Sequence, residues 1–145
     1  MATSKTQFST FYVAKRLYGL NVISVQEVTK ALPVTRVPLA PKFVRGLINL
    51  RGQIATAITV KDLFELKDSS FAEPPMNVVC RGDGLLISLL VDQIGDVVEL
   101  DGSLFEPTPD TIDPGVSRFM SGVYKTSGNL LSVLDIKKIV EVLQK

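Results

Sequence analysis

The sequence predicts a mainly β protein made of two small, similar units that pack against each other. Three observations predict this fold class: the chain repeats itself, its short apolar segments alternate at period two, and turn residues recur about every 8 to 12 residues. The 145 residues are 46% hydrophobic and 21% charged, which is typical of a folded globular protein. A unit of about 65 residues is marginal alone because it buries too little surface, so the two units are expected to share a core.

The repeat is clearest between two 22-residue segments. FVRGLINLRGQIATAITVKDLF starts at Phe43 and FMSGVYKTSGNLLSVLDIKKIV starts at Phe119; they align without a gap at an offset of 76 (119 − 43), and both glycines of the first recur in the second. Upstream, LNVISVQEV at 20–28 aligns with LLVDQIGDV at 89–97 at an offset of 69 (89 − 20). Aligned glycines and matching apolar positions together indicate a duplicated unit.

The repeat divides the chain into two subdomain copies within one domain that spans 1–145. The copies cover approximately 7–66 and 77–145. They are joined by a linker at about 67–76, within a segment that contains neighbouring serines and prolines.

Each copy is expected to begin with a short strand and a turn. Residues 11–13 (Phe-Tyr-Val) and 78–80 (Val-Val-Cys) are short apolar runs, and they are followed by the turn segments KR at 15–16 and GDG at 82–84. Runs of β-branched and aromatic residues bounded by turn residues are typical of strands.

The stretch RGLINLRGQI predicts a β-hairpin. Residues 47–50 form its first strand, Arg51 and Gly52 form the turn, and the second strand begins at Gln53, because glycine readily adopts the positive φ that tight hairpin turns need. Gly46 is expected to end a short helical turn before the first strand. A phosphate-binding P-loop is excluded, since five residues rather than four separate the glycines and no lysine follows the second one.

The strand after this turn and the last helix complete the predicted elements. Along the strand, Ile54, Thr56 and Ile58 alternate with smaller residues, and this even-numbered face, continued by Val60, is expected to be the buried one. At the C-terminus, Asp135 is expected to cap a helix. The apolar face of that helix consists of Ile136, Ile139, Val140 and Leu143.

The absence of histidine and the balanced charge exclude several function classes. Without histidine the chain cannot build a Ser-His-Asp or Cys-His catalytic arrangement, a histidine metal site or a phosphohistidine relay. Sixteen Lys and Arg residues against fifteen Asp and Glu give a net charge of +1, without the basic excess typical of nucleic-acid-binding proteins. No cofactor, metal site or catalytic residue is predicted.

The cysteine content and the hydropathy predict the compartment. The single cysteine, Cys80, lies in an apolar run and is expected to be a buried thiol in a reducing environment. The N-terminal MATSKTQ lacks the apolar core of a signal peptide, and the densest apolar run, 85–91, is shorter than the roughly 18 residues of a spanning helix. We therefore expect a cytoplasmic protein without direct membrane insertion.

Two alternatives from other function classes remain open at this point. The first is a carboxylate-dependent hydrolase that uses the acidic cluster of Asp92, Asp96, Glu99 and Asp101, although the spacing of these residues matches no calcium loop and solvated strand edges explain them more simply. A pocket that gathers these carboxylates would favour the hydrolase. The second alternative is a small-barrel nucleic-acid binder, which an aromatic-lined basic stripe would favour.

With the duplication, the absence of histidine and the Asn-Leu-Arg-Gly sequence established, the chain resembles the CheW-like family of bacterial chemotaxis coupling proteins. The resemblance covers nearly the whole chain and rests on VQEV at 25–28, VPLAPKFVRGLINLRGQI at 37–54, LLVDQIGDV at 89–97 and the closing SGVYKTSGNLLSVLDIKKIV. It implies two small five-stranded SH3-like β-barrel subdomains packed together, a short C-terminal helix and no catalytic activity.

The resemblance also implies partners and a binding surface. It implies an adaptor that couples the cytoplasmic tip of methyl-accepting chemoreceptors to the regulatory domain of the histidine kinase CheA. Carried over residue by residue, it implies that Val25, Glu27, Gly46, Asn49 and Arg51 lie in or beside the surfaces that bind receptor or kinase. Because the receptor tip is a helical hairpin, we expect an exposed apolar groove at the seam between the barrels, with polar rims and a solvent-facing Arg51.

The chain departs from the family pattern just after the hairpin turn. Where the family commonly has Leu-Pro-Val-Ile-Asp-Leu-Arg, this chain has Ala-Thr-Ala-Ile-Thr-Val-Lys at 55–61. Thr56 replaces the proline, Thr59 replaces the aspartate, and Lys61 keeps the positive charge without the forked donors of arginine. We expect these changes to alter contacts made by the outer face of this strand and to leave the fold intact.

Overall fold

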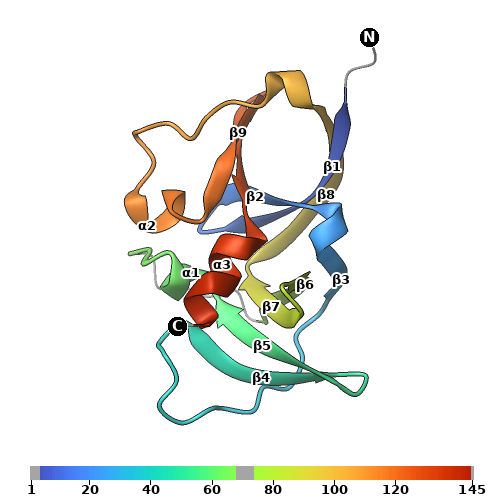
Figure 1. Cartoon of the computed structure of the whole chain (residues 1–145), viewed down its shortest axis with the longest axis vertical. Helices are drawn as coiled ribbons and strands as arrows, with labels where there is room; N and C mark the ends of the chain where they lie inside the picture. The colour runs from blue at the N-terminus through green and yellow to red at the C-terminus, as the bar shows by residue number, and fades with distance from the viewer. Residues whose placement is uncertain (1–3, 68–73, 145) are drawn as a thin grey trace.

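The computed structural model describes residues 4–67 and 74–144 (Figure 1). These residues form a mainly β structure with a short C-terminal helix, as predicted. In chain order the elements are β1 (Lys5–Val13), β2 (Arg16–Asn21), η1 (Val22–Ser24), β3 (Val25–Thr29), β4 (Val44–Leu50), β5 (Gln53–Thr59), α1 (Val60–Leu63), β6 (Met76–Gly82), β7 (Leu85–Val91), β8 (Gln93–Asp101), η2 (Gly102–Leu104), α2 (Pro114–Ser117), β9 (Met120–Thr126), β10 (Asn129–Leu134) and α3 (Ile136–Leu143).

The strands form two five-stranded sheets. One sheet has the order β8-β1-β2-β10-β9 and is called the terminal sheet, because it holds the first and the last strands of the chain. The other has the order β3-β6-β7-β5-β4 and is called the central sheet. Figure 1 shows the terminal sheet curling so that β9 faces β1 across its interior. The predicted architecture of two small five-stranded units is therefore confirmed.

The repeat is visible in the topology, but the sheets divide the chain differently from the copies. The strands of each copy can be numbered one to five, so that β1–β5 belong to the first copy and β6–β10 to the second. Both sheets then have the order 3-1-2-5-4. Each sheet takes its strands one and two from one copy and its strands three to five from the other copy. The chain therefore crosses between the sheets at η1 and again at Asp92 between β7 and β8. The linker predicted at 67–76 ends at the first residue of β6, and its residues 68–73 lie outside the described part of the chain, so the linker stays a prediction.

In each sheet, one isolated bridge joins the segment that follows one outer strand to the other outer strand, and a glycine leaves room for it. Thr35 bridges Leu47 of β4, and Glu106 bridges Val123 of β9. Leu47 and Val123 are equivalent positions in the repeat. A Cβ on Gly46 would lie 2.3 Å from the carbonyl oxygen of Thr35, and a Cβ on Gly122 would lie 2.5 Å from that of Glu106. The recurring glycines thus allow the closing segment to pass over the strand.

The prediction that Gly46 ends a helical turn is wrong. Gly46 lies within β4, where the register against β5 shifts between Val44 and Gly46, and its φ is 150°. The sequence signal was misread because a glycine before an apolar run also fits a strand over which another segment closes.

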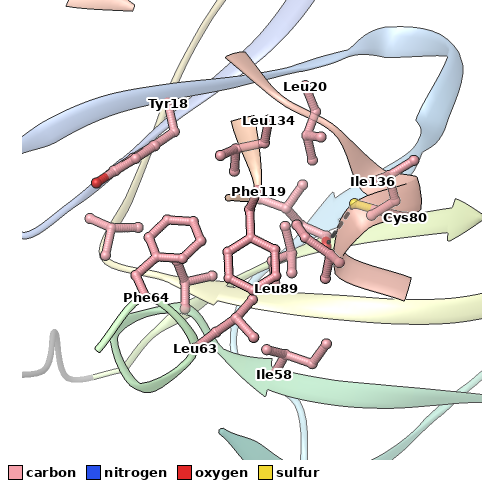
Figure 2. Close-up of a cluster of buried hydrophobic side chains, with 14 of the residues drawn as sticks. Tyr18, Leu20, Ile58, Leu63, Phe64, Cys80, Leu89, Phe119, Leu134 and Ile136 are labelled. Atoms are coloured by element: carbon pink, nitrogen blue, oxygen red, sulfur yellow. Dashed lines mark hydrogen bonds between the residues drawn. The ribbon is translucent and has the colours of Figure 1, made fainter. Parts of the chain in front are cut away.

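The largest apolar cluster lies between the two sheets and fills the seam. Figure 2 shows Tyr18 and Leu20 of the terminal sheet together with Ile58 and Leu89 of the central sheet. The helices contribute Leu63, Ile136, Ile139 and Val140. Among the described residues the interior of the seam is a packed core, and the exposed apolar groove along the seam stays a prediction. Two smaller clusters fill the sheets themselves, one around Phe8 and Leu131 and the other around Leu50 and Val79.

The burial of β5 differs in part from the predicted alternation. Ile58 is buried in the seam, as expected, but Ile54 on the same face is 58% exposed and the small Ala55 and Ala57 are fully buried. The even-numbered face points out of the central sheet, so it is covered only at the end where the terminal sheet packs over it. The odd-numbered face points into the narrow interior, where Ala55 contacts the cluster of Leu50 and Val79.

The C-terminal helix forms as predicted. The Asp135 side chain accepts a hydrogen bond from the backbone N–H of Lys137 at 3.0 Å and so caps α3. Ile136, Ile139 and Val140 are buried. A Cβ on Gly82 of β6 would lie 3.1 Å from Val140, which shows how closely the helix packs on the central sheet.

Cys80 is fully buried, as predicted, and burial raises the pKa of its thiol from 9.0 to about 12. Because the thiolate is the reactive form, we expect the native protein to resist thiol reagents at pH 8 and to react only in denaturant.

The thiol of Cys80 also makes the free energy of unfolding depend on pH. Above pH 9 the unfolded chain releases a proton that the folded chain keeps, so the free energy of unfolding should fall by up to about 1.4 kcal/mol per pH unit until the pH approaches 12.

Urea denaturation at several pH values between 8 and 11 measures this dependence, with Cys80→Ala as the reference for the other titrating groups. The decline should be steeper in the natural protein than in Cys80→Ala. Equal slopes, or rapid labelling of the native thiol, would contradict the prediction.

Candidate partner-binding surface

The five residues that the resemblance singles out all lie on the central sheet. Val25 and Glu27 are on β3, Gly46 and Asn49 are on β4, and Arg51 is in the turn between β4 and β5. β3 and β4 are the two outer strands of this sheet. Whether these residues are near each other therefore depends on how the sheet curls.

An ion pair between Arg51 and Glu27 shows that the outer strands meet. Nη2 of Arg51 donates a hydrogen bond to Oε2 of Glu27, so the β4–β5 turn reaches across to β3. The Glu27 side chain is 21% exposed, whereas that of Arg51 is 72% exposed, which confirms the solvent-facing Arg51. The other carboxylate oxygen of Glu27 is buried and has no hydrogen-bond partner in the described part of the chain. The glutamate is thus only partly satisfied within the described part of the chain.

The backbone of the turn favours residues other than arginine. Arg51 and Gly52 have φ values of 51° and 87°, the pattern of a type I′ hairpin turn, in which asparagine or glycine is preferred at the first position. The Asn49 side chain supports the turn by accepting a hydrogen bond from the N–H of Gly52 at 2.9 Å. Holding arginine in a left-handed conformation costs on the order of 1 kcal/mol, so backbone geometry does not explain this arginine.

A second polar contact at the same corner was missed by the sequence analysis. Nη2 of Arg81 on β6 lies 3.2 Å from Oε1 of Gln26 and 3.4 Å from Oε1 of Gln53. Gln26 directly precedes Glu27 in the chain, and Gln53 directly follows Gly52. This closeness in sequence to the candidate residues could have added both glutamines to the predicted surface. Nothing local marks Arg81, because its role depends on the pairing of β6 with β3.

A hollow of about 360 Å³ lies beside Gln53 and Arg81. Its lining includes Ile54, Leu85 and Leu86, with Gln53 and Arg81 at its side. Ile54 is 58% exposed and Leu85 is 37% exposed. This corner therefore places exposed apolar side chains next to charged and polar groups, a combination that protein interfaces use.

Val25 and Gly46 have structural explanations instead. Val25 is half-buried, packs against the core between the sheets and pairs with Cys80. Gly46 is buried beneath the segment at Thr35. The structure thus brings Glu27, Asn49 and Arg51 together at one corner and places Val25 and Gly46 in supporting positions.

The four acidic residues of the hydrolase alternative do not form a site. Asp92 lies 3.2 Å from Nζ of Lys61, Glu99 lies 3.9 Å from Nζ of Lys5, and Asp101 caps η2 through the N–H of Ser103. They follow β8 from one end to the other, about 30 Å at the usual rise per residue. No group of three or more Cys, Asp or Glu residues within 4–67 and 74–144 is arranged to hold a metal ion.

No helix in the described ranges is both long and apolar enough to cross a membrane. The helices are short, and α3, with Ile136, Ile139 and Val140 buried against the sheets, contributes to the core.

Comparison with known proteins gives consistent results over the whole chain. A family model described as the CheW-like domain matches residues 7–144. The chain is 29% identical over 142 residues to the chemotaxis protein CheW of Thermotoga maritima, covering 97% of this chain and 91% of that protein. It is 26% identical over 134 residues to the chemotaxis protein CheW of Klebsiella aerogenes, covering 92% and 81%. A crystal structure of the scaffolding protein TtCheW from Thermoanaerobacter tengcongensis superimposes with a TM-score of 0.87 at 30% identity, covering 98% of this chain and 97% of that one.

Proposed function

This chain belongs to the CheW-like family of non-enzymatic chemotaxis scaffolding proteins, and we propose that it couples the cytoplasmic tip of a chemoreceptor to the regulatory domain of the histidine kinase CheA. Its place in the family makes it a signal-transduction adaptor with partners in a chemotaxis complex. Both proposed partners present these surfaces in the cytoplasm, which is where we place the coupling.

The observation that carries the proposal is the corner formed by Glu27, Arg51 and the hollow at Ile54. Arg51 is held on the surface at a backbone position that disfavours it, opposite a glutamate with a spare buried acceptor. Ile54 and Leu85 provide exposed apolar area next to it. Residues kept in unfavourable conformations gather at functional sites, and an arginine beside apolar area is the type of residue that contributes most to protein interfaces.

The Thr56 substitution lies within this corner. Thr56 lines the same hollow as Ile54 and Leu85. A proline here would lack the N–H that β5 can use in pairing with its neighbours, whereas threonine adds a hydroxyl to the lining of the hollow. We propose that this change adjusts which partner the corner prefers, while the strand pairing of β5 with β4 and β7 stays complete.

Replacing Arg51 by glycine should separate binding from stability. The change removes the cation and relieves the positive φ, and the ion pair, which is exposed on its Arg51 side, contributes about 1 kcal/mol. We therefore expect an unchanged or slightly raised Tm. Affinity for the receptor tip or for the kinase regulatory domain should fall by about 2 to 5 kcal/mol, because a charge desolvated in the complex loses its partner. Isothermal titration with each purified partner measures this loss.

Lys15→Gly is the matched control. Lys15 is also an exposed basic residue with a positive φ, 66°, in a hairpin turn, but it lies in the turn between β1 and β2 of the terminal sheet. Its replacement should leave both Tm and affinity unchanged. A lower Tm with full affinity in Arg51→Gly would make Arg51 a structural residue, and a natural protein that binds neither partner would refute the proposed function.

A further inference from the structure

A basic hollow lies at the other end of β4 from Arg51. It has a cavity volume of about 260 Å³ and is lined by residues of the β3–β4 connection, the start of β4, the end of β5 and α1. The polar side chains of this lining are Arg36, Lys42, Arg45, Thr59 and Asp62. Arg45 lies near the start of β4 and Arg51 lies in the turn after its end, six residues further along the chain, about 20 Å at the usual rise, so this hollow is distinct from the corner described above.

The described residues balance only part of the positive charge of the hollow. Nζ of Lys42 lies 3.7 Å from the carboxylate of Asp62, which accounts for the one acidic group in the lining. Arg36 and Arg45 are exposed and make no ion pair with another described residue. Both arginines also line a neighbouring hollow, so the two residues lie close together on this surface. Like charges held close together favour a bound anion, and guanidinium groups match the geometry of phosphate and carboxylate.

The internal repeat supplies an independent indication. Thr59 of the first copy is equivalent to Asp135 of the second, and the two backbones are alike: the N–H of Thr59 donates to Phe43 O at 2.8 Å and that of Asp135 donates to Phe119 O at 2.8 Å. Asp135 caps α3, whereas Thr59 stands at the N-cap of α1 without a capping side-chain bond. An aspartate at 59 would both cap α1 and offset the arginines. The first copy therefore lacks the N-cap carboxylate that the second copy has, and Asp62 is the one acidic residue in the lining where its cations gather.

We infer that this hollow is an oxyanion-binding site, which takes a phosphate or carboxylate group between Arg36 and Arg45. Threonine at 59 leaves the positive charge of the hollow available to a ligand, where aspartate would occupy the same place from within the chain. The inference rests on the charges and the repeat and is independent of the proposed coupling function.

Inorganic phosphate and acetate are the probes that distinguish the two chemical sources. Each is titrated into the full chain against sodium chloride of equal ionic strength, and binding is followed by Tm and by the backbone amide shifts of Val44, Arg45 and Thr59 in NMR spectra. At a concentration of ten times Kd, the effective anion should raise Tm by about 3 °C or more. Phosphate acting alone identifies a phosphate site, and both anions acting identify a general oxyanion site; either result supports the inference.

Two variants and one control make the test specific. The double variant R36Q/R45Q should weaken the effective anion at least about tenfold, since hydrogen bonds to charged groups are involved. T59D should do the same while keeping or raising Tm, because it introduces a cap. The control K15Q/K137Q removes two exposed charges elsewhere and should bind normally. The inference is overturned if neither anion acts beyond chloride, or if the control loses binding as much as R36Q/R45Q.

Discussion

Replacing Asp92 by alanine is expected to lower the free energy of unfolding by about 3 kcal/mol. Asp92 lies where the chain passes from the central to the terminal sheet, and its Oδ2 accepts a hydrogen bond from the N–H of Ala14 at 2.9 Å and lies 3.2 Å from Nζ of Lys61. The Lys61 side chain is only 6% exposed, so alanine would leave a buried ammonium without this carboxylate. The expected loss is at the low end for buried pairs because the Asp92 side chain is 26% exposed.

Urea denaturation followed by far-ultraviolet circular dichroism measures the loss. Asp96→Ala is the matched control, since Asp96 is an exposed acidic residue on β8, and its replacement should change stability by less than about 0.5 kcal/mol. Asp92→Asn keeps an acceptor for the Ala14 N–H and removes the charge, so its stability should be intermediate. If Asp92→Ala were as mild as Asp96→Ala, the ion pair would not stabilise the junction between the sheets.

This pair illustrates what the sequence could not predict. Asp92 was grouped with three other acidic residues because they are close in sequence, and solvated strand edges were the simplest explanation. Lys61 was interpreted as a substitute for a family arginine. Their contact joins a helix after β5 to the junction between β7 and β8, and no local pattern indicates such a pairing. Buried ion pairs depend on tertiary packing, whereas sequence patterns mainly report on neighbours along the chain.

Local chemistry, in contrast, was predictable. The hairpin turn at Arg51 and Gly52 and the cap of α3 by Asp135 formed as expected, because turn and cap preferences act over a few residues. The exposure of Ile54 was not predicted, since alternation reveals that a strand has two faces but not which one points into a narrow interior. For the candidate site, the resemblance supplied Glu27 and Arg51, and only the structure showed that they pair.

The exchange of strands between the copies leads to the prediction with the largest effect: neither copy should fold alone. Within one copy, the described strand pairs are only two hairpins, β1 with β2 and β4 with β5 in the first copy, and β6 with β7 and β9 with β10 in the second. The pairs β1–β8, β2–β10, β3–β6 and β5–β7 all join different copies. Because an isolated two-stranded hairpin is marginal in water, fragments 1–70 and 71–145 should each lack a cooperative thermal transition.

Mixing the two fragments in equal amounts should restore the fold as a one-to-one complex, because every pairing between copies can form without the covalent connection. Circular dichroism and size-exclusion chromatography follow the recovery, and an uncut chain is the reference.

The repeat also permits the opposite result. In the intact chain, strands one and two of each copy pair with strands three to five of the other copy. In a separate fragment they could pair with strands three to five of their own copy and form a barrel. A monomeric fragment with cooperative unfolding would show that this self-contained barrel is stable. The exchange would then be a consequence of linking the copies rather than a requirement for folding. We expect the complex instead, because the central core combines Tyr18 and Leu20 with Ile87 and Leu134, side chains that only the two copies together supply.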